Sequence, residues 1–432
     1  MELIRTEAER CVACGLCLPY CPTYAASRSE PESPRGRIAL ARGLAIGELG
    51  PTETLTAHLS SCTQCRACEK VCPAKVRYGH LIDESLEVLA QQGRRGGAHR
   101  WLRRRLQTVL DKADSRLAAW TRAYQSIGLR TMARAFGVLR LAGLASADAL
   151  LPDRPRSAAL QESYSAQGKR RGTVALFTGC VSRALDGDTL EAAIYLLTRL
   201  GYEVRVPTGQ TCCGALALHE GYAERAQAQF AQTLTCFADG EPDAIINVAS
   251  GCGATLSEYD ELLPDDPAAA RFADRVRDVS EFLADAPWPE DLAPAALPLR
   301  VAVQDPCTLR NVLRAEQSVY RLLGRIPEIE LLPLPDNHLC CGGAGTYPLR
   351  EPVLARKMAD RKLEHLRALQ PDLLVSANIG CALHLGGALR EAGLPLPLLH
   401  PVVVLARQLG WQPGNTESLA PTAARAVSYG HE

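Results

Sequence analysis

The alternation of apolar and polar residues beyond position 172 predicts a chain of strands and helices. Short apolar runs predict buried strands at 173–177, 203–207, 243–250, 299–304, 328–335 and 372–378. Stretches with apolar residues at helical spacing lie between them, at 188–202, 221–237, 315–326 and 351–369. Strands that alternate with helices favour parallel sheets flanked by helices.

This pattern occurs twice, and cysteines mark the same places in both copies. The first set is Cys180, Cys212, Cys213 and Cys252, and the second is Cys307, Cys340, Cys341 and Cys381. The two sets are separated by a shift of 127 to 129 residues, which indicates an internal repeat. The first and last cysteines of each set follow strands, and ligands of parallel sheets gather beyond the carboxyl ends of strands. We therefore expect each foursome to form a site, the alternative being cysteines buried in the core.

The adjacent cysteines of each set are followed by glycine. Gly214, Gly342 and Gly343 are expected to relieve the tight backbone that two neighbouring thiols require. The remaining cysteine, Cys236, falls in a helical stretch and is expected to be a small buried apolar residue.

A different cysteine pattern occupies the first 73 residues. Residues 11–22 and 62–73 both have the spacing C-x2-C-x2-C-x3-C-P, which is typical of [4Fe–4S] clusters, whereas zinc sites use pairs of C-x2-C. Ferredoxins with two such runs exchange the fourth thiolate between runs. This resemblance implies one cluster on Cys11, Cys14, Cys17 and Cys72, and a second on Cys62, Cys65, Cys68 and Cys21.

These patterns give the predicted organisation, a mixed α+β and α/β chain. A helical ferredoxin-type module with two clusters (1–90) is followed by a helical connector and linker (91–172), a first Cys-Cys-Gly repeat (173–295) and a second (296–432). The connector has a basic stretch that suits a partner or an anionic membrane surface, or else is an ordinary solvated helix face: Arg94, Arg95, Arg100, Arg103, Arg104 and Arg105.

Composition and charge narrow the classes of function. The 17 cysteines, and a charged start (MELIRTEAER) without the apolar core of a secretory signal, predict thiolate ligands in a reducing cytoplasm rather than disulfides. No apolar run is long enough to span a bilayer, so any membrane contact is expected to be peripheral, on the inner face. The net charge of +0 argues against a general nucleic-acid binder.

Several strings together resemble the iron–sulfur subunits of glycolate oxidase (glycolate dehydrogenase), relatives of the anaerobic glycerol-3-phosphate dehydrogenase C subunit and of heterodisulfide reductase B subunits. They are CPTY (21–24), PRGRI (34–38), TCCGA (211–215), PCTL (306–309), DNHLCCGGAGTY (336–347) and ANIGC (377–381). The resemblance implies an electron-transfer subunit that is not catalytic alone. It would take electrons from FAD-binding catalytic subunits and pass them toward a quinone or another acceptor.

Three other functions stay open at this point. One is a disulfide reductase like heterodisulfide reductase, another is a subunit of a lactate or glycerol-3-phosphate dehydrogenase, and the last is a metal-bound scaffold without redox activity. We find no glycine-rich dinucleotide fingerprint after a strand, so the chain is expected to lack its own flavin site and catalytic residues.

The chain departs from the wider Cys-Cys-Gly family at the last position of each repeat, where C-x2-C is expected. Thr255 stands there in the first repeat and His384 in the second. A hydroxyl is a poor iron ligand and an imidazole a fair one, so we expect the second foursome to hold a cluster and the first to bind metal more weakly or to serve structure and docking. His384 is either a further ligand or a hydrogen-bonding neighbour. His219 is expected to hydrogen-bond its site or to cap the following helix, and Arg35 and Arg37 to lie over cluster sulfurs or at the surface.

Overall fold

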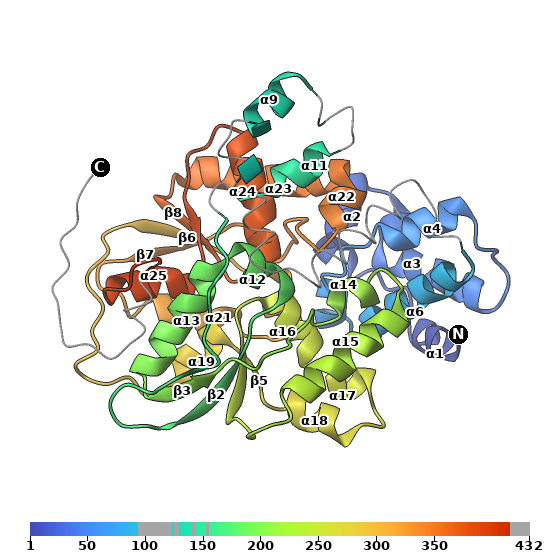
Figure 1. Ribbon diagram of the computed structural model, residues 1–432. Coiled ribbons are helices and arrows are strands. Elements are labelled where there is room, and N and C mark those ends of the chain that lie inside the picture. Colours follow the sequence, from blue (N-terminus) through green and yellow to red (C-terminus); the bar gives the residue numbers. More distant parts are fainter. Residues whose placement is uncertain (94–122, 125–128, 138, 140–143, 153–154, 415–432) are drawn as a thin grey trace.

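The computed structural model describes residues 1–93, 123–124, 129–137, 139, 144–152 and 155–414 (Figure 1). The basic stretch predicted between Arg94 and Arg105 lies outside these residues. No helix in the described ranges is both long and apolar enough to cross a membrane.

The N-terminal module is helical, as predicted. Its apolar core is formed by Ile4, Ile38, Leu59, Leu81 and neighbouring residues from four helices that pack around the cysteine runs. The elements of the module are α1 (Glu2–Glu9), η1 (Leu18–Tyr20), α2 (Pro22–Ser27), η2 (Glu30–Glu32), α3 (Pro34–Ala45), α4 (Glu53–Ser60), α5 (Ala67–Lys70) and α6 (Tyr78–Gln91).

Two sheets follow, and their strands are arranged in the same order. The strands of the first sheet lie in the order β1-β3-β2-β4-β5, and those of the second in the order β7-β6-β8-β9. Apart from β1, every strand pair is parallel. The strands are β1 (Ser163–Tyr164), β2 (Gly172–Phe177), β3 (Tyr202–Arg205), β4 (Ala244–Asn247), β5 (Val276–Asp278), β6 (Arg300–Gln304), β7 (Glu330–Pro333), β8 (Leu373–Ser376) and β9 (Leu398–Leu399).

The six strands predicted from apolar runs are confirmed, and three more strands are found. β5 and β9 add a fourth parallel strand to each sheet. β1 pairs antiparallel with β3, through Ser163 with Arg205, inside the stretch expected to be only a linker. The predicted parallel sheets are confirmed, and β1 adds one short antiparallel strand at the edge of the first sheet.

The helices of the repeats form layers on both sides of the sheets. Alternate residues of β2 point to opposite sides: Val174 and Leu176 join a core shared by both repeats, while Ala175 and Phe177 join an outer core of the first repeat. Strand β6 follows the same rule, with Val301 in the shared core. Helices α13 (Gly187–Arg199), α19 (Val279–Asp285), α21 (Glu316–Leu323) and α25 (Pro401–Gln408) fill the shared core between the two sheets.

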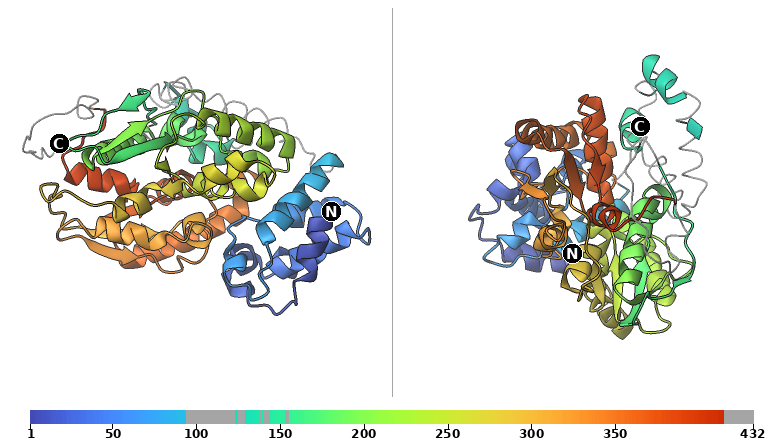
Figure 2. Two further views of the ribbon diagram at one scale, coloured as in Figure 1. Left: turned by 90° about the horizontal axis from the view of Figure 1, so that it is seen from below. Right: turned by 90° about the vertical axis from the view of Figure 1, so that its left-hand side faces the viewer.

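The outer layers carry the cysteine loops. They contain α12 (Cys180–Leu185), α14 (Ala215–Leu218), α15 (Ala223–Cys236), α16 (Ser250–Leu256), α17 (Tyr259–Leu262) and α18 (Pro267–Ala273) in the first repeat, and α20 (Cys307–Asn311), α22 (Tyr347–Arg350), α23 (Pro352–Leu369) and α24 (Ile379–Glu391) in the second. The connector adds α9 (Leu129–Ala135) and α11 (Ala145–Ala149). Figure 2 shows the N-terminal module, in blue, at one end of the molecule beside the stacked repeats.

Candidate iron–sulfur sites

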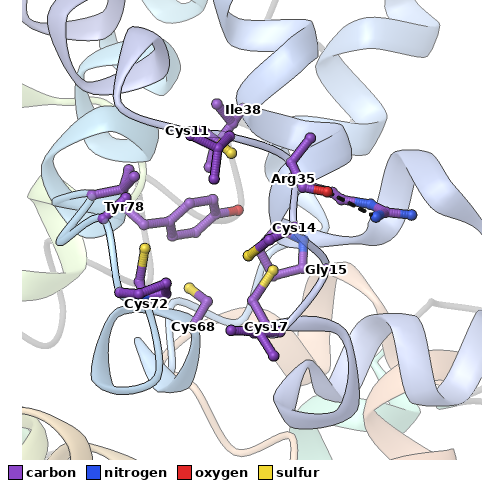
Figure 3. Close-up of a pocket in the computed structure, with 16 residues that line it drawn as sticks. Cys11, Cys14, Gly15, Cys17, Arg35, Ile38, Cys68, Cys72 and Tyr78 are labelled. Carbon is purple, nitrogen blue, oxygen red and sulfur yellow. Dashed lines mark hydrogen bonds between the residues drawn. The ribbon is translucent and has the colours of Figure 1, made fainter.

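The first predicted ligand set lines one pocket of the N-terminal module. Cys11, Cys14 and Cys17 come from the loop between α1 and η1, and Cys72 comes from the loop after α5. Cys68 lines the same pocket, and the thiols surround a common space beside the ring of Tyr78 (Figure 3). Cys14 is exposed, so this site lies at the surface of the molecule.

The second predicted set lies deeper in the module. The thiols of Cys21, Cys62 and Cys65 are close enough to Cys68 to raise its pKa, in addition to the larger effect of its burial. Cys21 and Cys65 are buried, and the Cys21 thiol lies 3.2 Å from Oγ1 of Thr23. The structure thus brings the predicted members of each set together, with Cys68 in the wall between them.

Arg37 lies beside this second set, while Arg35 lies near the first. The Arg37 side chain is fully buried. It donates hydrogen bonds to the carboxylate of Glu32 and to Oγ1 of Thr23, and its Nη1 lies 3.0 Å from Thr23 Oγ1. Burial works to lower the pKa of Arg37, but Tyr78, Cys62, Cys21 and Glu32 raise it. Arg37 therefore does not lie at the surface, and it is a neighbour of the predicted ligands Cys62 and Cys21. Arg35 donates to the carbonyl of Ala13 in the first cysteine loop, at 3.1 Å.

Each repeat gathers its four thiols in the same order. In the second repeat the sulfurs of Cys307 and Cys340 are 3.9 Å apart, Cys340 also contacts Cys341, and Cys341 contacts Cys381. The first repeat has the corresponding contacts, from Cys180 to Cys212, Cys213 and Cys252. All eight lie at the carboxyl edges of their sheets, in the helices and loops that follow strands.

A side-chain amide fastens each Cys-Cys loop to its sheet. Gln210 donates to the carbonyl of Leu176, at 3.0 Å, and accepts from the backbone N–H of Thr178, at 2.9 Å. Asn337 makes the same two bonds to β6, with the carbonyl of Val303 at 2.9 Å and the N–H of Asp305 at 3.1 Å. Sequence analysis did not identify this pair, because Gln210 and Asn337 differ in residue type and stand at different distances from the cysteines.

The glycine that follows each cysteine pair is required by the backbone. Gly214 and Gly342 have φ values of 86° and 89°, in the left-handed region that glycine adopts most easily. A Cβ atom on Gly343 would lie 2.7 Å from the carbonyl oxygen of Gly380, at the start of α24. The prediction that glycine relieves a tight turn here agrees with these values.

Four other predicted residues have distinct environments. His384 Nε2 lies 3.1 Å from the carbonyl oxygen of Ala355, a contact that suits a hydrogen-bonding neighbour of the site. Thr255 is buried. His219 does not cap the next helix, α15, whose N-cap is Tyr222, and its Nδ1 pairs with Asp83 of α6 at 3.0 Å. Cys236 is only partly buried, against the outer core of the first repeat.

The N-terminal module and the second repeat meet at their thiols. Cys65 packs against Cys340 and Cys307, and the side-chain amide of Asn311 donates to the carbonyl of Cys65 at 2.8 Å. Lys70 adds a hydrogen bond to the carbonyl of Arg310, also at 2.8 Å. The second foursome is therefore a direct neighbour of the second ferredoxin-type set.

The two foursomes are linked through Asn378. Its side-chain nitrogen donates to the sulfur of Cys381 at 3.4 Å, and its oxygen accepts from the backbone N–H of Gly251 at 3.2 Å. Gly251 precedes Cys252, the last thiol of the first foursome. One side chain thus contacts one foursome and reaches the backbone beside the other.

The thiol sets fit iron–sulfur clusters in their chemistry. Burial raises the pKa of Cys17 to about 11 and raises that of Cys62 and Cys68 as well, and a bound metal deprotonates a coordinating thiol. Among the described residues no three cysteine, histidine or acidic side chains meet closely enough to hold a single metal ion. A cubane lies between its four thiolates and binds one at each iron, so they need not meet at one point.

Comparison with known proteins identifies both parts of the chain. Residues 7–76 match the family model of a 4Fe-4S dicluster domain, and residues 174–257 and 301–386 each match that of a cysteine-rich domain. A probable glycolate oxidase iron-sulfur subunit of Bacillus subtilis (strain 168) is 36% identical over 402 residues, which cover 90% of both chains. The glycolate oxidase iron-sulfur subunit of Escherichia coli (strain K12) is 34% identical over 88% of this chain and 90% of its own.

A second group of relatives is shorter. Lactate utilization protein A of Geobacillus thermodenitrificans (strain NG80-2) is 33% identical over 236 residues, which are 98% of that protein and 54% of this chain. The two long relatives match almost from end to end, as the resemblance of the motifs had implied. The chain belongs to the family of glycolate oxidase iron–sulfur subunits.

Proposed function

We propose that this chain is the electron-transfer subunit of a complex that oxidises glycolate or a closely related 2-hydroxy acid. The observation that carries the proposal is the arrangement of thiols, which runs from the exposed Cys14 through Cys68 and Cys65 to Cys340. Iron–sulfur clusters, when bound, supply one-electron carriers. The names of the two long relatives supply the substrate, and they favour this function over a disulfide reductase.

Cys11, Cys14, Cys17 and Cys72 are proposed to hold one [4Fe–4S] cluster, and Cys21, Cys62, Cys65 and Cys68 a second. Cys307, Cys340, Cys341 and Cys381 are proposed to hold a third, with Cys180, Cys212, Cys213 and Cys252 as a weaker site. These sites are proposed to belong to separate domains, with the boundaries expected from the sequence: 1–90 for the two ferredoxin-type clusters, 91–172 for the connector, 173–295 for the first repeat and 296–432 for the second.

The substrate is proposed to be oxidised on FAD-binding partner subunits, because removal of a hydride needs an acceptor such as flavin. A quinone is the proposed final acceptor, since it can take two electrons one at a time, together with two protons. A quinone dissolved in lipid would place the complex on the cytoplasmic face of the membrane, as a peripheral protein.

The test uses the complete complex, purified without oxygen, with Cys14→Ser in this chain. Glycolate should still reduce the partner's flavin, but one [4Fe–4S] electron paramagnetic resonance signal and electron transfer to an external acceptor should be lost. Cys236→Ser is the matched control, because Cys236 belongs to none of the four thiol sets. An unchanged spectrum in Cys14→Ser, or turnover of glycolate by the pure single chain, would contradict the proposal.

A further inference from the structure

A lysine is buried next to the second foursome. Lys362 lies on α23 with its side chain only 1% exposed, which is rare for lysine unless the charge is compensated. The same face of α23 carries Ala359 and Leu363, which pack in one apolar cluster with Cys341 and Cys381. The helix therefore holds the lysine against the cysteine site.

The hydrogen bond that the Lys362 ammonium makes is to a neutral group. Its Nζ donates to the backbone carbonyl of Asp336, at 2.5 Å, in the loop that leads to Cys340. The carboxylate of Asp336 is turned to Arg361 and to His365, at 2.5 Å and 3.0 Å. This leaves the positive charge close to the thiols and only partly compensated by a carboxylate that Arg361 and His365 also contact.

The electrostatics agree with this placement. Burial lowers the pKa of Lys362, and among the groups that oppose this effect, Cys341 and Cys340 act more strongly than Asp336. A buried charge is costly unless it is paired, and iron bound to thiolates is an anionic group. A filled second site would supply the anion that the buried ammonium needs.

The first repeat has no such charge at the matching position. The N-caps of α15 and α23, Tyr222 and Glu351, are 129 residues apart, as are Cys252 and Cys381, and this shift relates Lys362 to Thr233. Thr233 is 1% exposed, as Lys362 is. The duplication thus places a cation on one of the two helices and a neutral hydroxyl at the same place on the other.

We propose that Lys362 compensates the charge of the second-repeat cluster and sets its potential above that of any cluster in the first repeat. This inference rests on the proposed function, since it requires a cluster on the second foursome. The physical reason is that a reduced cluster is more negative than an oxidised one, so a fixed positive charge favours reduction. Lys362 acts through its charge and is a positioning residue, not a ligand.

The test is a redox titration, followed by electron paramagnetic resonance, of the complete complex with Lys362→Met. The iron content should be retained, and the midpoint potential of the second-repeat cluster should become more negative. Lys362→Arg should keep the potential near its original value, and Thr233→Val is the matched control that should leave it unchanged. Cys341→Ser identifies which signal belongs to this cluster.

The outcomes separate the two proposals. An intact cluster with an unchanged potential in Lys362→Met would overturn the role of Lys362 and leave the proposed function standing. If the methionine variant loses the cluster while the arginine variant keeps it, the charge is needed to hold the cluster and the inference is supported. Loss in both variants would show a purely structural lysine and overturn it. Full iron content in Cys341→Ser would overturn the third cluster itself, and with it this inference.

Discussion

The two repeats share one backbone fold, but the side chains that surround their four thiols differ. Strand order, thiol order and the amide bonds of Gln210 and Asn337 are the same in both. The first foursome, however, packs among aromatic rings, including Phe177, Phe230 and Tyr259. The second lies against Lys362 and against Cys65 of the N-terminal module. Duplication has kept the geometry of the thiols, while the neighbouring side chains have made the two sites electrically different.

The largest expected difference between the repeats is in iron content. Cys341→Ser should remove the iron and acid-labile sulfide of one cluster, because it takes away one of four ligands at a site next to the module. Cys213→Ser should remove little, because the first foursome is expected to bind metal weakly. Iron and sulfide analysis of the two variants, purified side by side without oxygen, measures this. Equal losses would show that the two sites are equivalent.

A second comparison should show that the repeats are alike in their framework. Gln210→Ala and Asn337→Ala each remove the two hydrogen bonds that join the Cys-Cys loop to its sheet, and Gln210→Ala also removes bonds to the Pro207 carbonyl and the Thr178 hydroxyl. Each unpaired buried group costs about 1–3 kcal/mol, so both variants should lower the melting temperature of the chain, Gln210→Ala by at least as much as Asn337→Ala. Gln232→Ala, which removes one bond to Gly209 from an exposed side chain, serves as the control. A loss at only one of the two positions would show that the amide bonds are not equivalent.

The last helix of each repeat should respond to pH with opposite sign. Asp278 and His400 occupy the same position, as N-caps of α19 and α25, and each accepts a bond from the backbone N–H two residues on, at 2.8 Å and 3.2 Å. Burial raises the pKa of Asp278 to about 7 and lowers that of His400 to about 3. Unfolded values are about 3.9 and 6.5.

Between the unfolded and folded pKa values of Asp278, its contribution to stability falls as the pH rises from about 4 to 7, because the unfolded chain gives up the proton first. The contribution of His400 falls as the pH drops from about 6.5 to 3, because the unfolded chain binds the proton first. Each slope approaches about 1.4 kcal/mol per pH unit. Asp278→Asn and His400→Asn keep a capping side chain but remove the titrating group. The melting temperature of Asp278→Asn should therefore fall less than that of the original protein as the pH rises from about 4 to 7. The melting temperature of His400→Asn should fall less than that of the original protein as the pH drops from about 6.5 to 3. Parallel changes would contradict the comparison.

The smallest expected effect concerns the last motif position, which is Thr255 in the first repeat and His384 in the second. His384→Ala should keep the iron of the second repeat and cost about 1 kcal/mol, because it leaves the buried carbonyl of Ala355 without this bond. Thr255→Ala is the matching change in the first repeat and should also keep the iron content. Loss of one cluster in His384→Ala, as large as in Cys341→Ser, would show instead that the imidazole is a ligand.

The parts of the fold that sequence analysis predicted are those with a local or repeated signal. Apolar runs gave six strands, and the constant spacing of cysteines gave the duplication. β1 was missed because two residues, Ser163 and Tyr164, are too short to show alternation. The pairing of His219 with Asp83 was missed because the residues are 136 positions apart. Lys362 was missed because it stands in a helix rich in charged residues, and only packing shows which of them is buried.

The burial of Cys65 beneath the second repeat has a consequence for how the protein is made. Cys65 lies under Cys340 and Cys307, and Asn311 holds its carbonyl, whereas Cys14 is open to solvent. A protein that delivers iron and sulfide would therefore reach Cys14 in the folded molecule, but not Cys65. Maturation should therefore follow a fixed order, in which the inner site is filled before the second repeat closes over it and the outer site can be repaired at any later time.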